Sequence, residues 1–172
     1  MSWPLERATH SPAATKELAG RLARLCRPGD VVLLVGELGA GKTVFAQGFA
    51  AALGVEGPVT SPTFALLRHY RCGAGCAVGS LIHADVYRTG SLAEVADLAL
   101  AELVEEDAVA LVEWGELAAP ALGDSALVVT IGAPDPAGAV ERRVLTMEGR
   151  GHWALRADEV AAALAPAQRG AR

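Results

Sequence analysis

Residues 36–43 read Gly36-Glu37-Leu38-Gly39-Ala40-Gly41-Lys42-Thr43. This spacing fits GxxxxGK[ST], a loop that holds phosphate groups with its backbone N–H groups. An apolar, β-branched run precedes the loop at residues 31–35, and a stretch with helical apolar spacing follows it at residues 44–53. A glycine-rich turn that ended in Lys-Thr by chance would not be expected to lie between a buried strand and a helix. The order of strand, loop and helix therefore predicts a phosphate-binding loop.

Each residue type in the loop has a chemical reason. The three glycines allow the backbone to curl so that successive N–H groups point inward. Together with the start of a helix, these donors attract a polyphosphate. We expect the Lys42 ammonium to reach the β- and γ-phosphates and the Thr43 hydroxyl to ligate Mg²⁺. The predicted ligands are a nucleoside polyphosphate and Mg²⁺.

The bulk properties narrow the class of protein. A chain of 172 residues is expected to form a single domain over residues 1–172. A formal charge of −5 disfavours a surface that binds nucleic acid by itself, but leaves contact through a basic partner open. There is no apolar run of membrane-spanning length, and Met1–Arg7 does not resemble a signal peptide, so the expected location is cytoplasmic.

The cysteines are read as reduced thiols, because three is an odd number. Cys72 and Cys76 flank a Gly-Ala-Gly turn and could form half of a zinc knuckle. The second half of such a site is missing from the sequence. A hairpin turn with two incidental thiols is the favoured interpretation.

The rest of the chain alternates helical and strand patterns. Ser11 and Pro12 predict a helix start, and Ser91 with Glu94 predicts another. Further helices are expected near residues 101–105 and over 153–164, before a frayed tail at 165–172. Strands are expected at residues 64–71, 78–85, 109–112, 126–131 and 142–147, with turns at 73–75 and 134–138. This is an α/β pattern typical of a three-layer P-loop fold, with a mainly parallel central sheet and antiparallel additions.

Two acids end apolar strands. Asp85 closes residues 81–85 and Glu113 closes residues 110–113. Ligands of open α/β sheets bind at the carboxyl ends of strands, so both acids are candidates for holding Mg²⁺ or orienting water. Either acid could instead cap a helix or pair with Arg88. Two such acids beside a phosphate loop favour the functional interpretation.

Three further features are weaker signals. Ser61-Pro62-Thr63 could form a switch loop that senses the γ-phosphate, or be an ordinary loop. Trp114 follows Glu113 and could stack on adenine, or be a core or interface residue. His83 lies on the same strand face as Asp85 and could join a relay, although a satisfied core histidine is commoner. No Asn-Lys-x-Asp motif is present, so GTP is not favoured.

Taken together, four motifs resemble those of one family. They are Gly36–Thr43, Ser61-Pro-Thr-Phe64, His83-Ala-Asp-Val-Tyr-Arg88 and Val112-Glu-Trp-Gly-Glu116. Their order and spacing are similar to the small bacterial ATPases of tRNA threonylcarbamoyladenosine biosynthesis, the TsaE family, formerly YjeE. The similarity extends from about Ser11 to Met147. The combination of motifs is specific, whereas the phosphate loop alone is shared by hundreds of families.

The resemblance implies a function. TsaE-like proteins hydrolyse ATP in a complex with TsaB- and TsaD-type proteins, which modifies adenosine 37 of tRNAs reading codons that begin with A. Contact with tRNA is then indirect, through the complex. The ATP cycle is thought to reset the complex between turnovers.

The resemblance also implies roles for residues. Thr43 and Glu113 would ligate Mg²⁺, Asp85 would be essential for hydrolysis at or near the metal, and Lys42 would act with them. Ser61, Pro62 and Thr63 would form the mobile switch. The nucleotide contacts would come from the loop and three further residues: Gly36, Glu37, Leu38, Gly39, Ala40, Gly41, Lys42, Thr43, Val44, Ser11 and Trp114.

Two other classes of protein remain open. A small-molecule kinase shares the loop and fold but usually carries an arginine-rich lid, and residues 114–141 contain no arginine. A nucleotide-binding adaptor without significant hydrolysis is disfavoured by Asp85 and Glu113. A slow ATPase would resemble such an adaptor until its turnover is measured with partners.

Overall fold

A computed structural model describes residues 2–61, 67–87, 104, 107–116, 119, 124–133 and 141–165. Its strands are β1 (Leu5–Thr9), β2 (Val31–Val35), β3 (Leu67–Arg71), β4 (Ser80–Asp85), β5 (Ala108–Glu113), β6 (Leu127–Ile131) and β7 (Arg143–Gly149). Its helices are α1 (Pro12–Ala23), α2 (Lys42–Ala52), the 3₁₀ helix η1 (Gly151–Arg156) and α6 (Ala157–Ala163).

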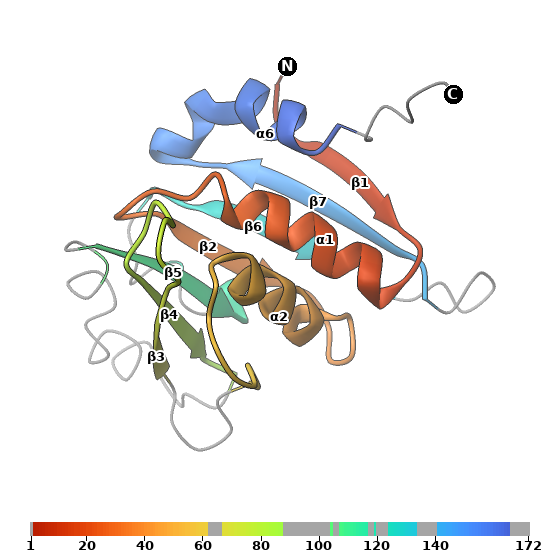
Figure 1. Cartoon of the computed structure of the whole chain (residues 1–172). Helices are drawn as coiled ribbons and strands as arrows, with labels where there is room; N and C mark the ends of the chain where they lie inside the picture. Colours follow the sequence, from red (N-terminus) through yellow and green to blue (C-terminus); the bar gives the residue numbers. More distant parts are fainter. Residues whose placement is uncertain are drawn as a thin grey trace, which may run out of the picture.

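The strands form one mixed sheet in the order β1-β7-β6-β2-β5-β4-β3 (Figure 1). The four central strands, β6, β2, β5 and β4, run parallel to one another. The outer pairs are antiparallel: β1 with β7, β7 with β6, and β3 with β4. β2 and β5 lie at the centre because they are apolar runs that can be buried on both faces. The predicted α/β fold with antiparallel additions is confirmed.

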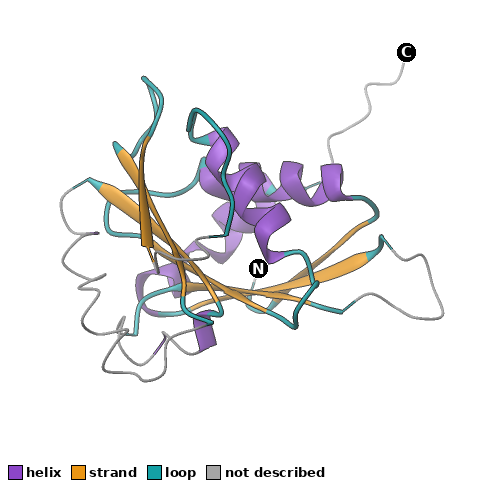
Figure 2. Ribbon diagram, turned by 90° about the horizontal axis from the view of Figure 1, so that it is seen from below, coloured by secondary structure: helices purple, strands orange, loops and turns teal. Residues whose placement is uncertain are grey.

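Helices α1 and α2 pack side by side on one face of this sheet (Figures 1 and 2). Phe45 and Phe49 of α2 are fully buried against it, as their helical spacing predicts. The two helices touch at Gly48, where a Cβ atom would lie 2.4 Å from the Cα of Lys16. The opposite face carries a second apolar cluster that includes Leu33, Ile82 and Val112. α2, and with it the phosphate loop, is therefore held against the sheet on one side and against α1 at its flank.

The structure differs from the sequence prediction at both ends of the described chain. Residues 5–9 form β1, which the pattern did not reveal, because only Leu5 and Thr9 are buried in this edge strand. The last helical segment begins at Gly151 as a 3₁₀ turn rather than at Trp153. Several predicted features lie outside the described residues: the helices near 91–94 and 101–105, the turn at 134–138, Arg88 and the tail after 165.

Residues 67–85 form the predicted hairpin. The Cys72 N–H donates a hydrogen bond to the Gly79 carbonyl at 2.9 Å, where the two strands meet the turn. All three cysteines are free, and burial raises the pKa of Cys72 to about 11. A thiol with a raised pKa is a poor nucleophile at neutral pH. None of the described helices has both the length and the apolar character needed to cross a membrane.

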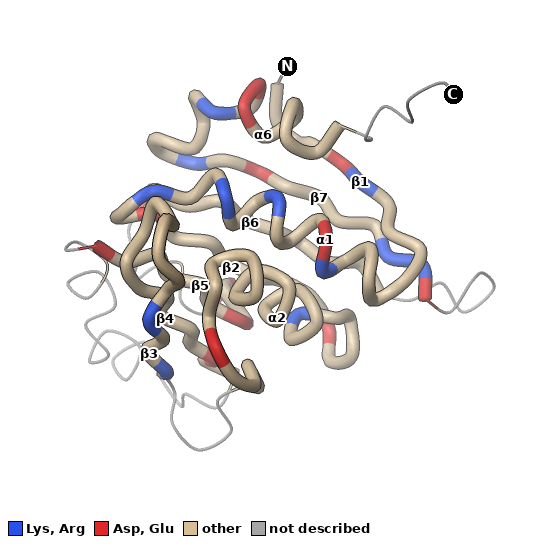
Figure 3. The backbone as a smooth tube through the Cα atoms, in the orientation of Figure 1, with Lys and Arg blue, Asp and Glu red and all other residues tan. Residues whose placement is uncertain are grey.

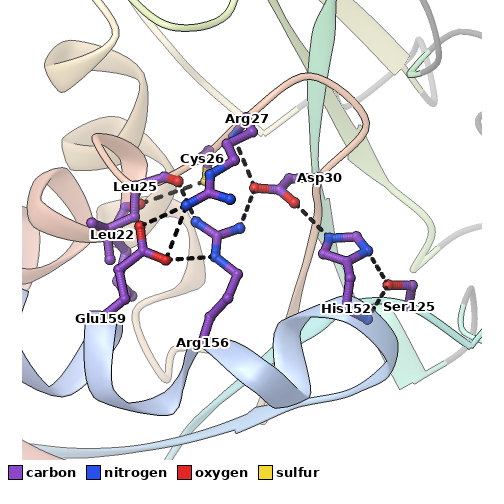
Figure 4. Close-up of polar contacts among 9 residues, drawn as sticks. All are labelled: Leu22, Leu25, Cys26, Arg27, Asp30, Ser125, His152, Arg156 and Glu159. Carbon is purple, nitrogen blue, oxygen red and sulfur yellow. Dashed lines mark hydrogen bonds and ion pairs between the residues drawn. The ribbon is translucent and has the colours of Figure 1, made fainter.

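A polar network around the buried Asp30 and Arg156 fastens the start of β2 to η1 and α6 (Figure 4). Asp30 accepts hydrogen bonds from the Arg27 N–H at 2.8 Å and Arg156 Nη1 at 2.9 Å. Its second oxygen lies 2.7 Å from His152 Nε2, and His152 contacts Ser125 through Nδ1. Although this is a serine, a histidine and an aspartate in a row, the aspartate is neutralised by Arg156. The network therefore serves to anchor the strand that leads into the phosphate loop.

Glu159 makes this network sensitive to pH. The hydrogen bond from Arg156 Nε, 2.9 Å long, lowers the pKa of Glu159 from its ordinary value of 4.5. A carboxylate with a lowered pKa stabilises the fold above its unfolded-state pKa, and this contribution is lost as the pH falls through the folded-state pKa. Because Glu159 is partly exposed, Glu159→Gln should cost about 1 kcal/mol or less at pH 7.

Thermal unfolding of Glu159→Gln and the unchanged chain at pH 7 and at pH 3 tests this. The gap in melting temperature should be about 2–4 °C at most at pH 7 and should narrow at pH 3. Glu148→Gln is the matched control, since Glu148 pairs only at 3.6 Å with the exposed Arg150. An equal gap at both pH values would show that Glu159 acts through packing and not through its charge.

Candidate active site

The predicted site residues meet at the carboxyl ends of β2, β5 and β4. The phosphate loop leaves β2, Glu113 ends β5 and Asp85 ends β4. In the sheet register, Glu113 is paired with Leu34 on one side and with Asp85 on the other. The parallel register therefore brings the loop and both acids to one edge of the sheet.

The phosphate loop needs glycine at its first and last turns. Gly36 has φ 153°, and a Cβ atom there would lie 2.6 Å from the Ile131 carbonyl oxygen. Gly39 and Gly41 have φ 78° and 115°, and Gly41 is the N-cap of α2. Left-handed backbone of this kind strains any residue with a side chain. The predicted order of strand, loop and helix is thus present, with α2 beginning at Lys42 itself.

Lys42 is buried and points back across the loop. Its Nζ donates to the carbonyl oxygens of Gly36 at 2.6 Å and Glu37 at 2.9 Å. It also lies 3.7 Å from the centroid of the Trp114 ring, a cation–π contact. Burial lowers the pKa of Lys42, and the nearby Glu113, Glu116 and Asp85 partly oppose this. The ammonium is therefore held at the position where the loop would receive phosphate.

Glu113 is almost fully buried, and its two carboxylate oxygens contact residues of two different elements, α2 and β4. Thr43 Oγ1 donates to Glu113 Oε2 at 3.2 Å, so the two predicted Mg²⁺ ligands are adjacent. His83 Nε2 lies 3.0 Å from the other oxygen, Oε1. Within the described part of the chain, His83 Nδ1 has no partner. The sequence placed His83 near Asp85, whereas its contact is with Glu113, one strand away.

Asp85 contacts the segment that the sequence predicts to be a switch. The Ser61 hydroxyl donates to Asp85 Oδ2, and the Tyr87 N–H donates to Oδ1 at 3.1 Å. Pro62 and Thr63 lie outside the described residues. Ser61 is thus brought to the site, next to an acid rather than to the phosphate loop.

Trp114 is held in a strained position beside Lys42. Its φ is 60°, in the left-handed region that a bulky residue adopts at a cost of about 1–3 kcal/mol. Its ring packs on Tyr87, with centroids 4.5 Å apart. The next residue, Gly115, packs closely on β2, since a Cβ atom there would lie 2.5 Å from the Leu33 Cβ. These contacts place the ring at the lysine end of the loop.

A small cavity of about 160 Å³ lies at the other end of the loop, beside Gly41 and Val44. The first turn of α1 contributes Pro12 and Thr15 to its wall. Ser11 is the cap of that helix: its hydroxyl accepts from the Ala14 N–H at 3.1 Å. The expected nucleotide contact of Ser11 is therefore close to this cavity, although its side-chain oxygen already serves the helix.

Arg143 is a site residue that the sequence did not reveal. It lines the same cavity, and its Nε donates to the Ala40 carbonyl in the phosphate loop at 2.8 Å. Arg143 begins an edge-side strand about a hundred residues after the loop, with no motif around it. Only the antiparallel placement of β7 next to β6 brings it back to the loop.

The donor set fits Mg²⁺ better than a transition metal. No cluster of three or more His, Cys, Asp or Glu suited to a metal is present in the described ranges. Mg²⁺ is commonly held by one or two protein oxygens, with waters and substrate phosphates completing the shell. Thr43 Oγ1 and the Glu113 carboxylate are such a pair.

Comparisons with known proteins identify the family. Residues 9–143 match the family model described as threonylcarbamoyl adenosine biosynthesis protein TsaE. The chain is 44% identical to the tRNA threonylcarbamoyladenosine biosynthesis protein TsaE of Streptomyces coelicolor, over 81% of this chain and 93% of that protein. It is 42% identical to the Bacillus subtilis TsaE, over 72% and 74%. The crystal structure of Bacillus subtilis YdiB superposes with a TM-score of 0.75 at 32% identity, covering 94% of this chain and 97% of that one. The chain therefore belongs to the TsaE family of threonylcarbamoyl adenosine biosynthesis proteins.

Proposed function

We propose that this protein is a Mg²⁺-dependent ATPase that works in the cytoplasm with TsaB- and TsaD-type proteins to form threonylcarbamoyladenosine at position 37 of tRNAs reading codons that begin with A. The family assigns the pathway. The observation that carries the ATPase is the Thr43–Glu113 contact, 3.2 Å long, at the mouth of a phosphate loop with its lysine in place. The tRNA surface is assigned to the partners, because this chain is acidic.

Each residue of the candidate site has a separate role in this proposal. Lys42 binds the terminal phosphates, and Trp114 orients its ammonium. Thr43 and Glu113 hold the metal, which when bound would offset negative charge on the phosphates. His83 fixes the Glu113 carboxylate through Nε2. Asp85 would orient a water, and its hydrogen bond from Ser61 supports a link to the switch segment.

Hydrolysis by the chain alone is expected to be slow. Two cations contact the phosphate loop in the described residues: Lys42, which is near Glu113, Glu116 and Asp85, and Arg143, whose guanidinium binds the Ala40 carbonyl. Neither is a free arginine directed at the terminal phosphates. An arginine supplied by another protein raises turnover by about 10³–10⁵ in well-studied GTPases. ATPase assays with and without TsaB- and TsaD-type proteins from the same cell test the proposal. Fast turnover by the isolated chain that partners leave unchanged would contradict it.

The same assay distinguishes an ATPase from a nucleotide-binding adaptor and from a small-molecule kinase. A nucleotide-binding adaptor would bind ATP but stay inactive with every partner. A small-molecule kinase would transfer phosphate to a metabolite, and the ATP consumed would exceed the free phosphate released. Equal release of ADP and phosphate, stimulated by partners, supports the ATPase.

Trp114→Ala is expected to weaken ATP binding by about 2- to 30-fold, the value of a cation–π contact of about 0.5–2 kcal/mol. The Lys42 contact favours a role at the phosphates over the adenine stacking that the sequence suggested. Competition by inorganic tripolyphosphate, which has no base, distinguishes the two. If Trp114 acts through Lys42, tripolyphosphate and ATP should lose affinity together.

Trp3→Ala is the control, since Trp3 contacts Ala154, far from the loop in the chain and outside the site described. A loss for ATP with unchanged tripolyphosphate binding would restore the stacking role. Trp153 is unsuitable as a control because it is fully buried in the core.

A further inference from the structure

Strand β3 carries an exposed basic patch on a protein whose net charge is negative. The patch consists of three exposed residues along the edge strand: His69 and Arg71 on the sheet face of Leu67, and Arg68 on the opposite face with Tyr70. Figure 3 shows basic positions along this strand. Most other arginines described in comparable detail pair with an acid or a carbonyl, such as Arg21, Arg27 and Arg156. No ion pair of the three patch residues is found among the described residues. The charge of the two arginines is therefore available to a partner.

The patch lies along an edge of the sheet. β3 is the last strand in the order, and it pairs only with β4 within the described part of the chain. Such an edge presents a row of alternating backbone N–H and C=O groups that another strand can match. Tyr70 packs on the core under the helices and Leu67 on the core of the opposite face. The strand is thus anchored on both faces while its charged side chains stay free.

A surface hollow of about 520 Å³ adjoins the patch. It is lined by His69, Arg71, Gly79, Ser80 and Asp107. The Asp107 side chain lies against Gly79, where its Oδ2 would be 2.0 Å from a Cβ atom. The remaining wall offers a guanidinium, an imidazole and a hydroxyl, which suit a carboxylate.

We propose that β3 is the docking surface for an extended acidic segment of a protein partner, which pairs with the free edge and places carboxylates on Arg68, His69 and Arg71. The proposal rests on the proposed function, since it supplies the contact through which a partner protein binds. A polypeptide matches both the N–H and the C=O groups of the edge, whereas RNA phosphates would match only donors. A protein is therefore the favoured occupant, and its acidic character follows from the patch.

The position of β3 links this surface to the active site. β3 pairs with β4 from Leu67↔Ala84 to Arg71↔Ser80, and β4 ends at Asp85. The chain enters β3 a few residues after Ser61, whose hydroxyl contacts Asp85. A segment added at β3 would be separated from β4, the strand that ends at this acid, by β3 alone. Docking there can bias the position of Asp85 without covering the phosphate loop.

The double variant Arg68→Glu/Arg71→Glu tests the proposal. TsaB- and TsaD-type proteins from the same cell are the probes, with binding measured by calorimetry and turnover by phosphate release. We expect affinity for the partners to fall at least about tenfold at 0.1 M salt, with a weaker salt dependence, because exposed interfacial charges act on association. Stimulated turnover should fall with it, while ADP affinity and turnover of the isolated chain stay unchanged.

The matched control is Arg24→Glu/Arg150→Glu, which makes the same change of charge at two exposed arginines outside the patch. Equal losses in the control and the test variant would overturn the proposal, as would full partner binding by Arg68→Glu/Arg71→Glu. Binding of tRNA by the chain alone that is lost in the test variant would replace the protein occupant by RNA. If the wild-type chain binds neither protein, both the proposed function and this surface fail, whereas retained binding in the variant removes the surface alone.

Discussion

Glu113→Gln is expected to lower ATP turnover by about 10²–10³ while changing ADP affinity only a few-fold. Glu113 is buried, accepts from Thr43 at 3.2 Å and lies 3.0 Å from His83. Glutamine keeps the volume but removes the charge. A group that acts on charge developing in the transition state contributes mainly to turnover and little to ground-state binding, and loss of one such group costs about this factor.

Asp85→Asn should behave in the same way, since the Asp85 carboxylate is the second acid at this sheet edge. Turnover should be measured with partners present, where the rate is high enough for a large loss to be seen. Glu116→Gln is the control: Glu116 is exposed, and it influences Lys42 only through its charge. Normal stimulated turnover of either acid variant would remove that acid from the mechanism.

Lys42→Ala is expected to weaken ATP binding by about 10- to 100-fold. A hydrogen bond to a charged group contributes about 1.5–3 kcal/mol, and 1.4 kcal/mol is a tenfold change in affinity. The substitution also removes the two bonds that hold the carbonyls of Gly36 and Glu37. Lys16→Ala is the control, because Lys16 is the other lysine of the sequence and is exposed. Equal ATP affinity in both variants would contradict the assignment of Lys42.

Thr43→Ala separates phosphate binding from metal binding. Thr43 contacts Glu113 and not the loop carbonyls, so its loss should weaken nucleotide binding mainly when Mg²⁺ is present. ATP titrations of Thr43→Ala and Lys42→Ala in Mg²⁺ and in excess EDTA provide the comparison. The Lys42 loss should persist in EDTA, whereas the Thr43 loss should shrink. If the Thr43→Ala loss is the same in both buffers, Thr43 does not act through the metal.

Local sequence patterns predicted those helices and strands whose formation depends on neighbouring residues in the chain. The buried strands β2 and β5 are apolar runs, and the start of α1 has its cap and proline in sequence. β1 was missed because its alternation involves only Leu5 and Thr9, and its pairing with β7 is made across almost the whole chain. Such a strand is stabilised by pairing with its neighbouring strand rather than by its own β-propensity.

Some residues of the candidate site could likewise be predicted from the sequence, and others could not. The loop, Asp85 and Glu113 could be placed from motifs, because parallel strands end at a common edge. The contact of His83 with Glu113 depends on the β4–β5 register, which no motif specifies. Arg143 reaches Ala40 only through the return of β7, and Trp114 reaches Lys42 only through its positive φ. These positions require the three-dimensional structure.

The central place of β2 has a consequence for the order in which this protein can be made. The strand that carries the phosphate loop ends at Val35, but its neighbours in the sheet are β5 and β6, which end at Glu113 and Ile131. A ribosome adds about 5–20 residues per second, so the loop emerges several seconds before either neighbour. Contacts between residues so distant in sequence form late and slowly. If nucleotide binds as proposed, it is therefore expected to stabilise the nascent chain only after synthesis has passed residue 131.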